Sequence, residues 1–397
     1  MNFDIALVGM GIVGLSTALE LKNVHPDISI VIIDKEKDIA LHQSGNNSGV
    51  IHSGIYYKSG SAKAENCLEG YSKMITYCEE KQIDYSLCGK LIIAKNESEV
   101  TELNNIYDRG IEKGMKNLEI IDGKQIKEIE PHVTGYKAIR VPQAGIVDYK
   151  RVSLKIQEDL KDKGVTFLYN TKVLGIKIGK DIQIKTSKES VNSKFIVNCA
   201  GLYSDRLAKL SGCNINYKIL PFRGEYYQLK KELNHLVKGL IYPVPDPNFP
   251  FLGIHLTKKM DNCIEAGPNA VLAFRREGYK LSDVNFSELG ETLRYSGFQK
   301  LVSKYASVGI KELRRSMSKR TFLKELQSFI PSLSLNDFKY RGAGVRAQAC
   351  DPEGNLIDDF MIQSEGNVVN VCNAPSPAAT SCFAIAENIV KNFVKLK

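Results

Sequence analysis

Residues 4–34 read DIALVGMGIVGLSTALELKNVHPDISIVIID, and this stretch decides the fold. Its first apolar run, 5–8, has the length of one buried strand, and a second apolar run over 28–33 ends on Asp34. Between the two runs lie the glycine-rich turn 9–14 and an amphipathic segment with leucines at helical spacing. Strand, glycine turn, helix, strand and acid in this order predict a βαβ unit that binds a dinucleotide.

Each glycine of this turn has its own purpose. Gly9 permits a tight turn, Gly11 lets the backbone approach a pyrophosphate, and Gly14 lets the helix pack closely on the strand. The start of the helix offers free N–H groups and a partial positive charge to the phosphates. Asp34 can accept hydrogen bonds from both ribose hydroxyls, and an ordinary glycine-rich turn does not explain that acid.

The size and charge of the chain limit its class. Its 397 residues are too many for one simple core, so we expect two domains. A content of 43% hydrophobic and 25% charged residues is typical of a globular protein. The net charge of +9 fits an anionic substrate, a membrane surface or nucleic acid. Because the sequence has no nucleic-acid-binding motif and no basic–aromatic repeat, we predict no nucleic-acid partner.

Cysteine usage and hydropathy indicate the compartment. The nine cysteines are scattered and form no CxxC pair, which fits a reducing compartment better than a disulfide framework or a zinc site. We therefore predict no metal. The chain starts directly on a strand without a signal peptide, and no apolar run approaches the ~18 residues that cross a bilayer. We expect a cytoplasmic protein, either soluble or peripherally bound at the inner face of the membrane.

Three separate regions have a ligand-facing character, rich in glycine or small residues: 9–14, 44–54 and 373–381. An NAD enzyme usually needs one such region, so a longer ligand that reaches across a domain fits better, and FAD is such a ligand. Its flavin would lie between the 44–54 loop and the N-terminus of a C-terminal helix predicted over 378–395, which stabilises the charge that develops on reduction. The predicted cofactor-binding residues are Gly9, Gly11, Ile12, Val13, Gly14, Asp34, Lys35, Ser44, Asn47, Ser48, Val173, Ala200, Gly201, Asn373, Ala378, Ala379 and Thr380.

The order of the elements predicts an α/β (α+β) fold. A strand-then-helix pattern at both ends of the chain indicates a discontinuous Rossmann-like FAD-binding domain, and short strands with turn signals between them indicate an inserted, mostly antiparallel β-sheet domain for the substrate, flanked by helices. We assign 1–80, 145–215 and 335–397 to the first domain, and 81–144 and 216–334 to the second.

The inserted part also contains helical patterns over 287–306 and 310–329. Within them, the run 311–324 holds six basic residues against one acid. Such a run is usually a solvated helix face, and the alternative is contact with a membrane or a partner.

Several blocks of sequence resemble a known family. The blocks are HQSGNNSGVIHSGIYY at 42–57, PFRGEYY at 221–227, YPVPDPNFPFLGIHLT at 242–257, GPNAVLAF at 267–274, RGAGVRAQ at 341–348 and VCNAPSPAATS at 371–381. Together with the glycine turn they resemble the L-2-hydroxyglutarate oxidase/dehydrogenase family, of the D-amino-acid-oxidase-like FAD-dependent oxidoreductase superfamily, from residue 3 to about 392. One departure is Asp34, where Glu is common in the family, but an aspartate still binds ribose hydroxyls.

The resemblance implies FAD-dependent oxidation of L-2-hydroxyglutarate to 2-oxoglutarate. A hydride would pass from Cα to flavin N5, and the electrons would go on to a quinone or to oxygen. This chemistry needs a base for the hydroxyl proton, and His52 and His255 are the candidates, with His52 preferred because it follows the flavin-facing loop. Arg346 is the candidate that binds a substrate carboxylate.

Each of these residues also has an ordinary structural interpretation. His52 could be a half-buried histidine with satisfied hydrogen bonds, and Arg346 a surface arginine on a strand. Arg223 is a weaker carboxylate ligand because Glu225 could simply pair with it. Tyr56, Tyr57 and Tyr242 are candidates for the wall of the pocket or for plain aromatic packing.

Other functions remain open from the sequence. A flavin enzyme of the same fold could act on an amino acid, an N-methyl amino acid or glycerol 3-phosphate. A flavin-containing tRNA-modifying protein would need a reactive cysteine or a basic groove, and neither is visible. The sequence leaves the electron acceptor, the oligomeric state and covalent attachment of the flavin undecided.

Overall fold

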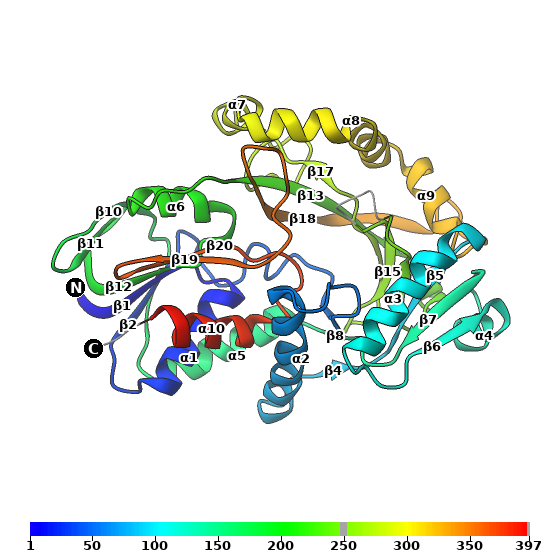
Figure 1. Ribbon diagram of the computed structural model, residues 1–397, viewed down its shortest axis with the longest axis horizontal. Coiled ribbons are helices and arrows are strands. Elements are labelled where there is room, and N and C mark those ends of the chain that lie inside the picture. Colours follow the sequence, from blue (N-terminus) through cyan, green and yellow to red (C-terminus); the bar gives the residue numbers. More distant parts are fainter. Residues whose placement is uncertain (247–251, 395–397) are drawn as a thin grey trace.

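The computed structural model describes residues 1–246 and 252–394 as an elongated molecule with a large sheet at each end (Figure 1). Within these residues, the first sheet has eight strands in the order β10-β11-β12-β1-β2-β9, with β20 beside β12 and β19 beside β20. Strands β9, β2, β1, β12 and β20 run parallel to their neighbours in this group. The bounds are β1 Asn2–Val8, β2 Ile30–Ile33, β9 Thr166–Leu168, β10 Val173–Lys177, β11 Ile182–Thr186, β12 Val191–Asn198, β19 Met361–Glu365 and β20 Val368–Asn373.

Strand β1 shows why this sheet is buried on both faces. Ile5 and Leu7 belong to the core beneath the helices α1 and α10, whereas Ala6 and Val8 belong to the core on the face of α6. A parallel strand that is covered on both faces needs such a continuous apolar run. The helices of this part are α1 Ile12–Val24, α2 Ala62–Glu80, α5 Tyr149–Asp162, α6 Ser204–Leu210 and α10 Cys382–Phe393.

The second sheet has nine strands in the part of the chain that is described, in the order β17-β13-β16-β15-β14-β5-β7-β6, with β18 beside β13. Among the described residues, neighbouring strands of this sheet are antiparallel, except that β14 and β5 are parallel. Its strands are β5 Lys90–Ala94, β6 Glu119–Asp122, β7 Lys137–Val141, β13 Lys218–Leu229, β14 Leu240–Pro243, β15 His255–Lys258, β16 Ile264–Gly267, β17 Val271–Leu272 and β18 Phe338–Cys350. Its helices are α3 Val100–Glu112, α4 Gly123–Ile129, α7 Phe286–Leu293, α8 Ser296–Met317 and α9 Lys319–Gln327.

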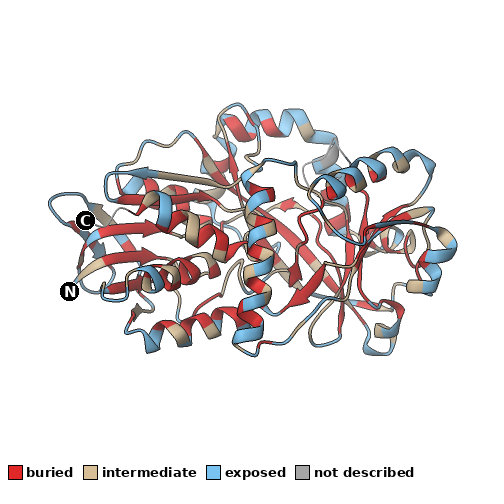
Figure 2. Cartoon of the chain, turned by 60° about the horizontal axis from the view of Figure 1, so that its bottom comes forward, coloured by how far each residue is buried: buried red, intermediate tan, exposed pale blue. Residues whose placement is uncertain are grey.

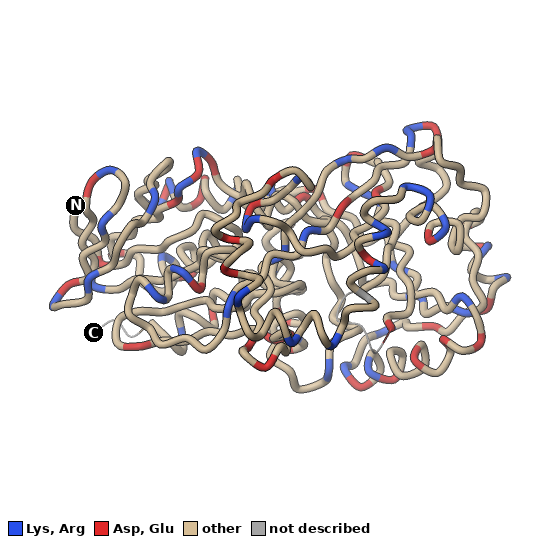
Figure 3. Tube along the Cα trace, turned by 90° about the horizontal axis from the view of Figure 1, so that it is seen from above, with Lys and Arg blue, Asp and Glu red and all other residues tan. Residues whose placement is uncertain are grey.

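A small third sheet has the strand order β3-β8-β4 and consists of β3 Val50–Ile51, β8 Gly145–Val147 and β4 Tyr85–Ser86. Along the chain, its strands occur where the chain passes from one large sheet to the other. Figure 2 shows the strands of both large sheets mostly buried, while the outer helices are exposed on one side. Basic and acidic residues are mixed along the whole chain (Figure 3). Among the described helices, none is both long and apolar enough to cross a membrane.

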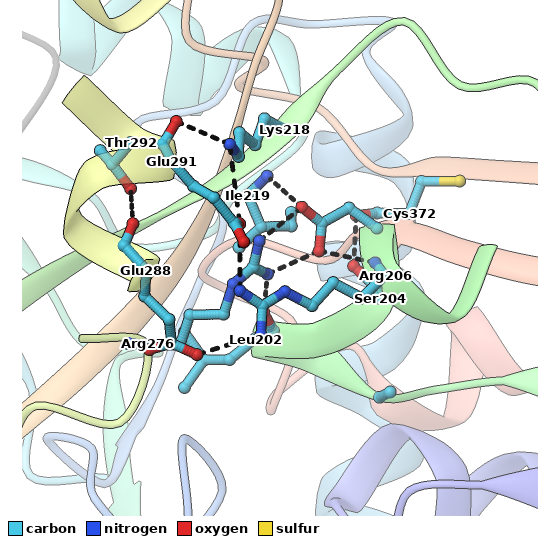
Figure 4. A network of polar contacts seen from close by, with 12 residues as sticks. Leu202, Ser204, Arg206, Lys218, Ile219, Arg276, Glu288, Glu291, Thr292 and Cys372 are labelled. Carbon is cyan, nitrogen blue, oxygen red and sulfur yellow. Dashed lines mark hydrogen bonds and ion pairs between the residues drawn. The ribbon is translucent and has the colours of Figure 1, made fainter. Parts of the chain in front are cut away.

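Two long strands and a buried ion pair connect the two halves. Strand β13 follows α6 and pairs with β18 at twelve positions. Strand β18 in turn leads into β19 of the first sheet (Figure 1). Arg276, in the loop after β17, donates to both carboxylate oxygens of Asp205 in α6, at 2.5 and 2.7 Å. Figure 4 shows the surrounding contacts, including the bond from Arg276 to the Leu202 carbonyl. The boundaries between the two domains remain a proposal.

Three helix predictions from the sequence are wrong in their bounds. The segment 287–306 is not one helix, because α7 ends at Leu293 and α8 runs from Ser296 to Met317. The segment 310–329 is not one helix either, because α8 ends at Met317 and α9 starts at Lys319. The Ser318 side chain accepts a hydrogen bond from the Thr321 N–H and so caps the new helix. The C-terminal helix begins at Cys382 rather than at residue 378, and the preceding residues form turns.

Candidate active site

A cavity of about 880 Å³ extends from the glycine turn to the second sheet. Its wall includes residues from both large sheets, from the loop 34–48 and from the segment 371–379, which covers the end of β20 and the turns after it. Such a volume is at the upper end of the range for cofactor and ligand sites. Of the predicted cofactor-binding residues, those in the wall are Gly9, Gly11, Ile12, Val13, Asp34, Lys35, Ser44, Asn47, Ser48, Val173, Ala200, Gly201, Asn373, Ala378 and Ala379.

The glycine turn has the close backbone contacts that a dinucleotide site needs. Gly9 has φ +114°, and a Cβ there would lie 2.4 Å from the Cys199 carbonyl oxygen. A Cβ on Gly14 would lie 2.2 Å from the Gly9 carbonyl oxygen, so Gly14 serves the packing of helix on strand and is not in the cavity wall. The turn is therefore pressed against the end of β12 while its other side faces the cavity, and FAD fits this arrangement.

Asp34 and Ser44 shape the start of α1. Oδ2 of Asp34 accepts a hydrogen bond of 2.7 Å from the Met10 N–H, and Oγ of Ser44 accepts one of 2.9 Å from the Ile12 N–H. Both side chains also lie in the cavity wall. The acid predicted to bind ribose is thus held beside the glycine turn by the turn's own backbone.

A network of charged side chains lies beside Asp34. The Lys35 ammonium pairs with Glu277 at 2.6 Å and also with Glu36, and His42 lies 3.1 Å from each of the two carboxylates. The ligand atoms of Glu36, His42 and Glu277 are close enough together to hold a metal ion. Because Lys35 already supplies a positive charge to both carboxylates, the group is an ion-pair network at the wall of the cofactor cavity.

His52 is held through its backbone. Its N–H donates a hydrogen bond of 3.1 Å to Oγ1 of Thr380, and that hydroxyl lies 2.7 Å from the hydroxyl of Tyr149. Thr380 is completely buried and is not among the residues of the cavity wall. The His52 ring faces the cavity, with Nε2 3.5 Å from Oγ of Ser376. Burial and then the positive charges of Lys90, Lys63 and Arg346 lower the pKa of His52 to about 3.

His255 in β15 reaches the same cavity from the second sheet. Its ring stacks on Tyr242 with centroids 4.0 Å apart and an angle of 8°, and Nδ1 lies 3.1 Å from the Thr257 hydroxyl. Burial, followed by the charges of Lys90, Arg346 and His52, holds the pKa of His255 well below its usual value. Both histidines are therefore neutral at pH 7, and a neutral imidazole is the form that accepts a proton.

Three cations lie around the histidines. Arg346 in β18 is in the cavity wall. Lys63 is in the same wall and only 8% exposed, and Lys90 is 2% exposed with its Nζ 4.2 Å from the centre of the Tyr242 ring. Burial lowers the pKa of Lys90 to about 8. The buried Lys63 and Lys90 and the half-buried Arg346 bring positive charge to this end of the cavity, which favours an anionic ligand.

The structure decides between several alternatives for the other candidates. Arg223 is 1% exposed and pairs with Glu225 at 3.2 Å, so it belongs to a buried ion pair and is not in the cavity wall. Tyr56, Tyr57 and Tyr242 do lie in the wall.

Sequence reasoning missed several residues in or near the cavity. Tyr226 lies in the wall, and burial raises its pKa to about 12, so its hydroxyl is protonated at pH 7. Lys63 and Lys90 were missed because lysine is normally exposed. Lys90 did carry a signal, since it opens the apolar strand KLIIA directly after Gly89.

Comparisons with known proteins agree with this geometry. The FAD dependent oxidoreductase family matches residues 4–391. An L-2-hydroxyglutarate dehydrogenase of Indibacter alkaliphilus is 50% identical over 391 residues, which is 98% of each chain. The mitochondrial L-2-hydroxyglutarate dehydrogenase of Homo sapiens is 46% identical over 97% of this chain and 87% of the relative.

The fold has solved counterparts as well. The L-alpha-glycerophosphate oxidase from Mycoplasma pneumoniae with FAD bound has a TM-score of 0.81 at 21% identity, and the match covers 98% of this chain and 94% of that one. At this identity the likeness concerns the fold, and it confirms the predicted fold class. The resemblance found in the sequence is confirmed too: the chain belongs to the FAD dependent oxidoreductase family, within it to the L-2-hydroxyglutarate dehydrogenases, and FAD is its cofactor.

Proposed function

We propose that this chain oxidises L-2-hydroxyglutarate to 2-oxoglutarate. The observation that carries the proposal is the meeting of two neutral histidines and three cations around one cavity, in a chain whose relatives bear this activity in their names. The substrate is a dianion at neutral pH, and buried cations offset the cost of bringing its two carboxylates out of water. When bound, FAD would supply the two-electron acceptor for the hydride that leaves the substrate's Cα, and a quinone or oxygen would be the final acceptor.

His52 is the proposed base. Its imidazole is neutral before the substrate binds, so a ring nitrogen can take the proton of the C2 hydroxyl as the hydride leaves. Thr380 and Tyr149 fix its backbone, which keeps the ring in one place. His255 has the same charge state and is the alternative base; we propose that it lines the substrate side of the cavity.

Arg346 is the proposed ligand of the carboxylate next to the reacting carbon. A guanidinium binds a planar carboxylate with two parallel hydrogen bonds, which fixes both the position and the orientation of C2. The cofactor-binding residues of the cavity wall are likewise proposals: the glycine turn for the pyrophosphate, Asp34 for the ribose, and the 44–48 and 373–379 segments for the flavin.

An anaerobic substrate panel tests this function. The purified holoenzyme is mixed with L-2-hydroxyglutarate, D-2-hydroxyglutarate, glycerol 3-phosphate, sarcosine and D-amino acids, and flavin bleaching is followed. We expect rapid bleaching with L-2-hydroxyglutarate alone. Bleaching by an amino acid, an N-methyl amino acid or glycerol 3-phosphate instead would give the function to the alternative substrate classes. Reoxidation with a quinone or with oxygen then identifies the acceptor.

We also propose that the protein is cytoplasmic and that its 311–324 segment makes peripheral contact with the inner face of the membrane. Three apolar side chains of α8 support this, because Ile310, Leu313 and Met317 are 54%, 42% and 73% exposed. Basic residues such as Lys311 and Arg314 alternate with them. One basic residue of the run is unavailable, since Arg315 pairs with Glu312 and Glu325.

Sedimentation with vesicles tests the membrane contact. We expect the protein to sediment with vesicles that contain phosphatidylglycerol, and Met317→Glu to reduce the bound fraction while flavin reduction by L-2-hydroxyglutarate persists. Equal binding by the wild type and this variant would exclude the α8 face.

A further inference from the structure

The substrate class proposed above has two carboxylates, and Arg346 is assigned to only one of them. The second carboxylate is three carbon–carbon bonds from the reacting C2. Its ligand must be a buried donor that reaches the cavity at some distance from His52. Lys63, in the first turn of α2, meets these conditions, because it is 8% exposed and lies in the cavity wall.

In the structure, the Lys63 ammonium holds a carboxylate of the chain itself. Its Nζ lies 2.7 Å from Oδ1 of Asp358, and the Asp358 side chain is 85% exposed. The pair is therefore unequal: a buried cation is joined to an anion that water largely solvates. Solvation and screening make such an exposed carboxylate a weak partner. A carboxylate of a ligand inside the cavity would have less water around it and would bind the ammonium more strongly.

The ion pair lies where two cavities meet. A second cavity of about 630 Å³ adjoins the first, and Tyr56, Tyr57, Lys63 and Asp358 belong to the walls of both. Lys58 lines only the second one. Lys63 can thus exchange a partner on the outer side for a ligand on the inner side without leaving its place in α2.

Side chains of the cavity wall lie between Lys63 and the proposed base. The Lys63 ammonium lies 5.1 Å from the centre of the Tyr57 ring. Tyr57 and Ser376 are both in the wall of the first cavity, and the Ser376 hydroxyl lies 3.5 Å from Nε2 of His52. A five-carbon diacid with C2 at His52 can extend along these side chains toward Lys63.

Lys90 is the competing candidate for the same role. Its ammonium contacts the rings of Tyr242 and Tyr56, at 4.2 and 5.3 Å, and it is not in the wall of either cavity. Lys90 therefore acts on the cavity through its electric field, whereas Lys63 can touch a ligand.

We propose that Lys63 binds the substrate carboxylate remote from the reacting carbon, and that Asp358 holds this position until the substrate displaces it. This inference rests on the proposed function. It makes Lys63 a residue that selects 2-hydroxy dicarboxylates over 2-hydroxy monocarboxylates of similar length. Asp358 should weaken binding of the dicarboxylate, because its carboxylate competes with that of the substrate for Lys63.

The test compares two substrates on the wild-type holoenzyme, on three variants at Lys63 and Asp358, and on the control variant Lys58→Met. L-2-hydroxyglutarate is compared with L-2-hydroxyvalerate, which has the same five carbons and lacks the remote carboxylate. We expect Lys63→Met to lower the ratio of the two kcat/KM values by about 10–100-fold, the value of one hydrogen-bonded charge. Lys63→Arg, which keeps the charge, should recover part of the ratio. Asp358→Asn should lower the KM for L-2-hydroxyglutarate by about two- to fivefold.

Calorimetric titration of 2-oxoglutarate and 2-oxovalerate separates this inference from the proposed function. The wild type should prefer the dicarboxylate and Lys63→Met should lose that preference, whether or not turnover occurs. If L-2-hydroxyglutarate reduces the flavin but the Lys63→Met ratio equals that of Lys58→Met, the inference is overturned and the function stands. If flavin reduction fails while the binding preference still depends on Lys63, the function is overturned and the dicarboxylate site stands. If L-2-hydroxyglutarate does not reduce the flavin and the binding preference does not depend on Lys63, both the function and the dicarboxylate site are overturned.

Discussion

The backbone N–H of His52 donates a hydrogen bond of 3.1 Å to the hydroxyl of Thr380, which lies 328 residues later in the chain. The same hydroxyl lies 2.7 Å from the Tyr149 hydroxyl, which in turn donates to the Val50 carbonyl. The loop that carries the proposed base is therefore fixed by two distant segments of the chain, around Tyr149 and Thr380. A base on an otherwise irregular loop gains from this a defined position relative to the flavin.

Replacement of His52 tests its role as the base. We expect His52→Gln to keep FAD bound and to slow flavin reduction by about 10²–10⁴-fold, because the glutamine cannot accept the hydroxyl proton. Stopped-flow absorbance under anaerobic conditions measures the rate. A loss below about tenfold would move the role to His255 or to solvent. In the wild type, kcat/KM should show no acid limb near pH 6.5, because the pKa of His52 is about 3.

Lys90 should make substrate binding depend on pH in the alkaline range. Burial lowers its pKa to about 8, so the positive charge behind Tyr242 is lost as the pH rises through 8. We expect KM for the dianionic substrate to rise between pH 8 and about 9.5, and kcat to change less. In Lys90→Met this rise should disappear, with a higher KM at pH 7. The same rise in both proteins would assign it to another group.

The titration of Lys90 also has a consequence for folding. The unfolded chain keeps the proton up to its ordinary pKa of 10.5, whereas the folded chain releases it near pH 8. Between these values the unfolded state binds more protons, so this group's contribution to stability increases as the pH rises. It is least favourable below pH 8, where the folded protein must bury the charge.

Arg346 should determine substrate affinity. We expect Arg346→Met to raise KM for L-2-hydroxyglutarate by about 10–100-fold, since one charge-assisted carboxylate contact is lost, with a smaller change in kcat. Arg294→Met is a matched control, because Arg294 is an exposed arginine at the end of α7. Equal KM values for the two variants would make Arg346 a structural residue.

The glycine turn should control retention of FAD. In Gly9→Ala the new Cβ would lie 2.4 Å from the Cys199 carbonyl oxygen at a φ of +114°, so the turn must shift away from β12. We expect FAD to bind at least about tenfold more weakly, as measured by the flavin content and by titration of the apoprotein. Gly309→Ala, where a Cβ would meet nothing within 4 Å, should keep the wild-type flavin content.

The buried pair of Arg276 and Asp205 should matter for stability. Asp205 is 3% exposed, so Arg276→Met leaves an unpaired carboxylate in the interior. We expect a loss of about 3–5 kcal/mol in the free energy of unfolding. Arg206, whose side chain is 35% exposed where it pairs with Glu288, is the control, and Arg206→Met should cost less than about 1 kcal/mol. Urea denaturation measures both, and equal losses would contradict this account.

The sequence predicted the parts of the fold that follow from local patterns. The apolar runs around Gly9 and Asp34 fix the βαβ unit, because each strand is covered on both faces. The bounds of helices were harder: Ala378 and Ala379 are good helix formers, but the chain there is still in turns after Pro375 and Pro377. At Ser318 the cap is a side-chain hydrogen bond that hydrophobic periodicity does not reveal.

The candidate site was predictable only where a motif points to it. His52 and Arg346 belong to glycine-rich blocks, whereas Lys63 is one of many lysines on a helix. Whether such a lysine meets water or a cavity depends on where α2 lies, and that position is set by its packing against α10 and the first sheet. Tertiary contacts between distant segments therefore determine the part of the site that sequence patterns could not show.

The pairing of β13 with β18 has a further consequence for how substrate reaches the cavity. Twelve paired positions, from Lys218 with Cys350 to Leu229 with Phe338, form a two-stranded antiparallel ribbon that extends from one half of the molecule into the other. A hinge motion that separates the two halves would have to bend this ribbon or break its hydrogen bonds. We therefore expect substrate and product to enter and leave through movements of single side chains and short loops at the cavity entrance. The two sheets would then keep their relative position during turnover.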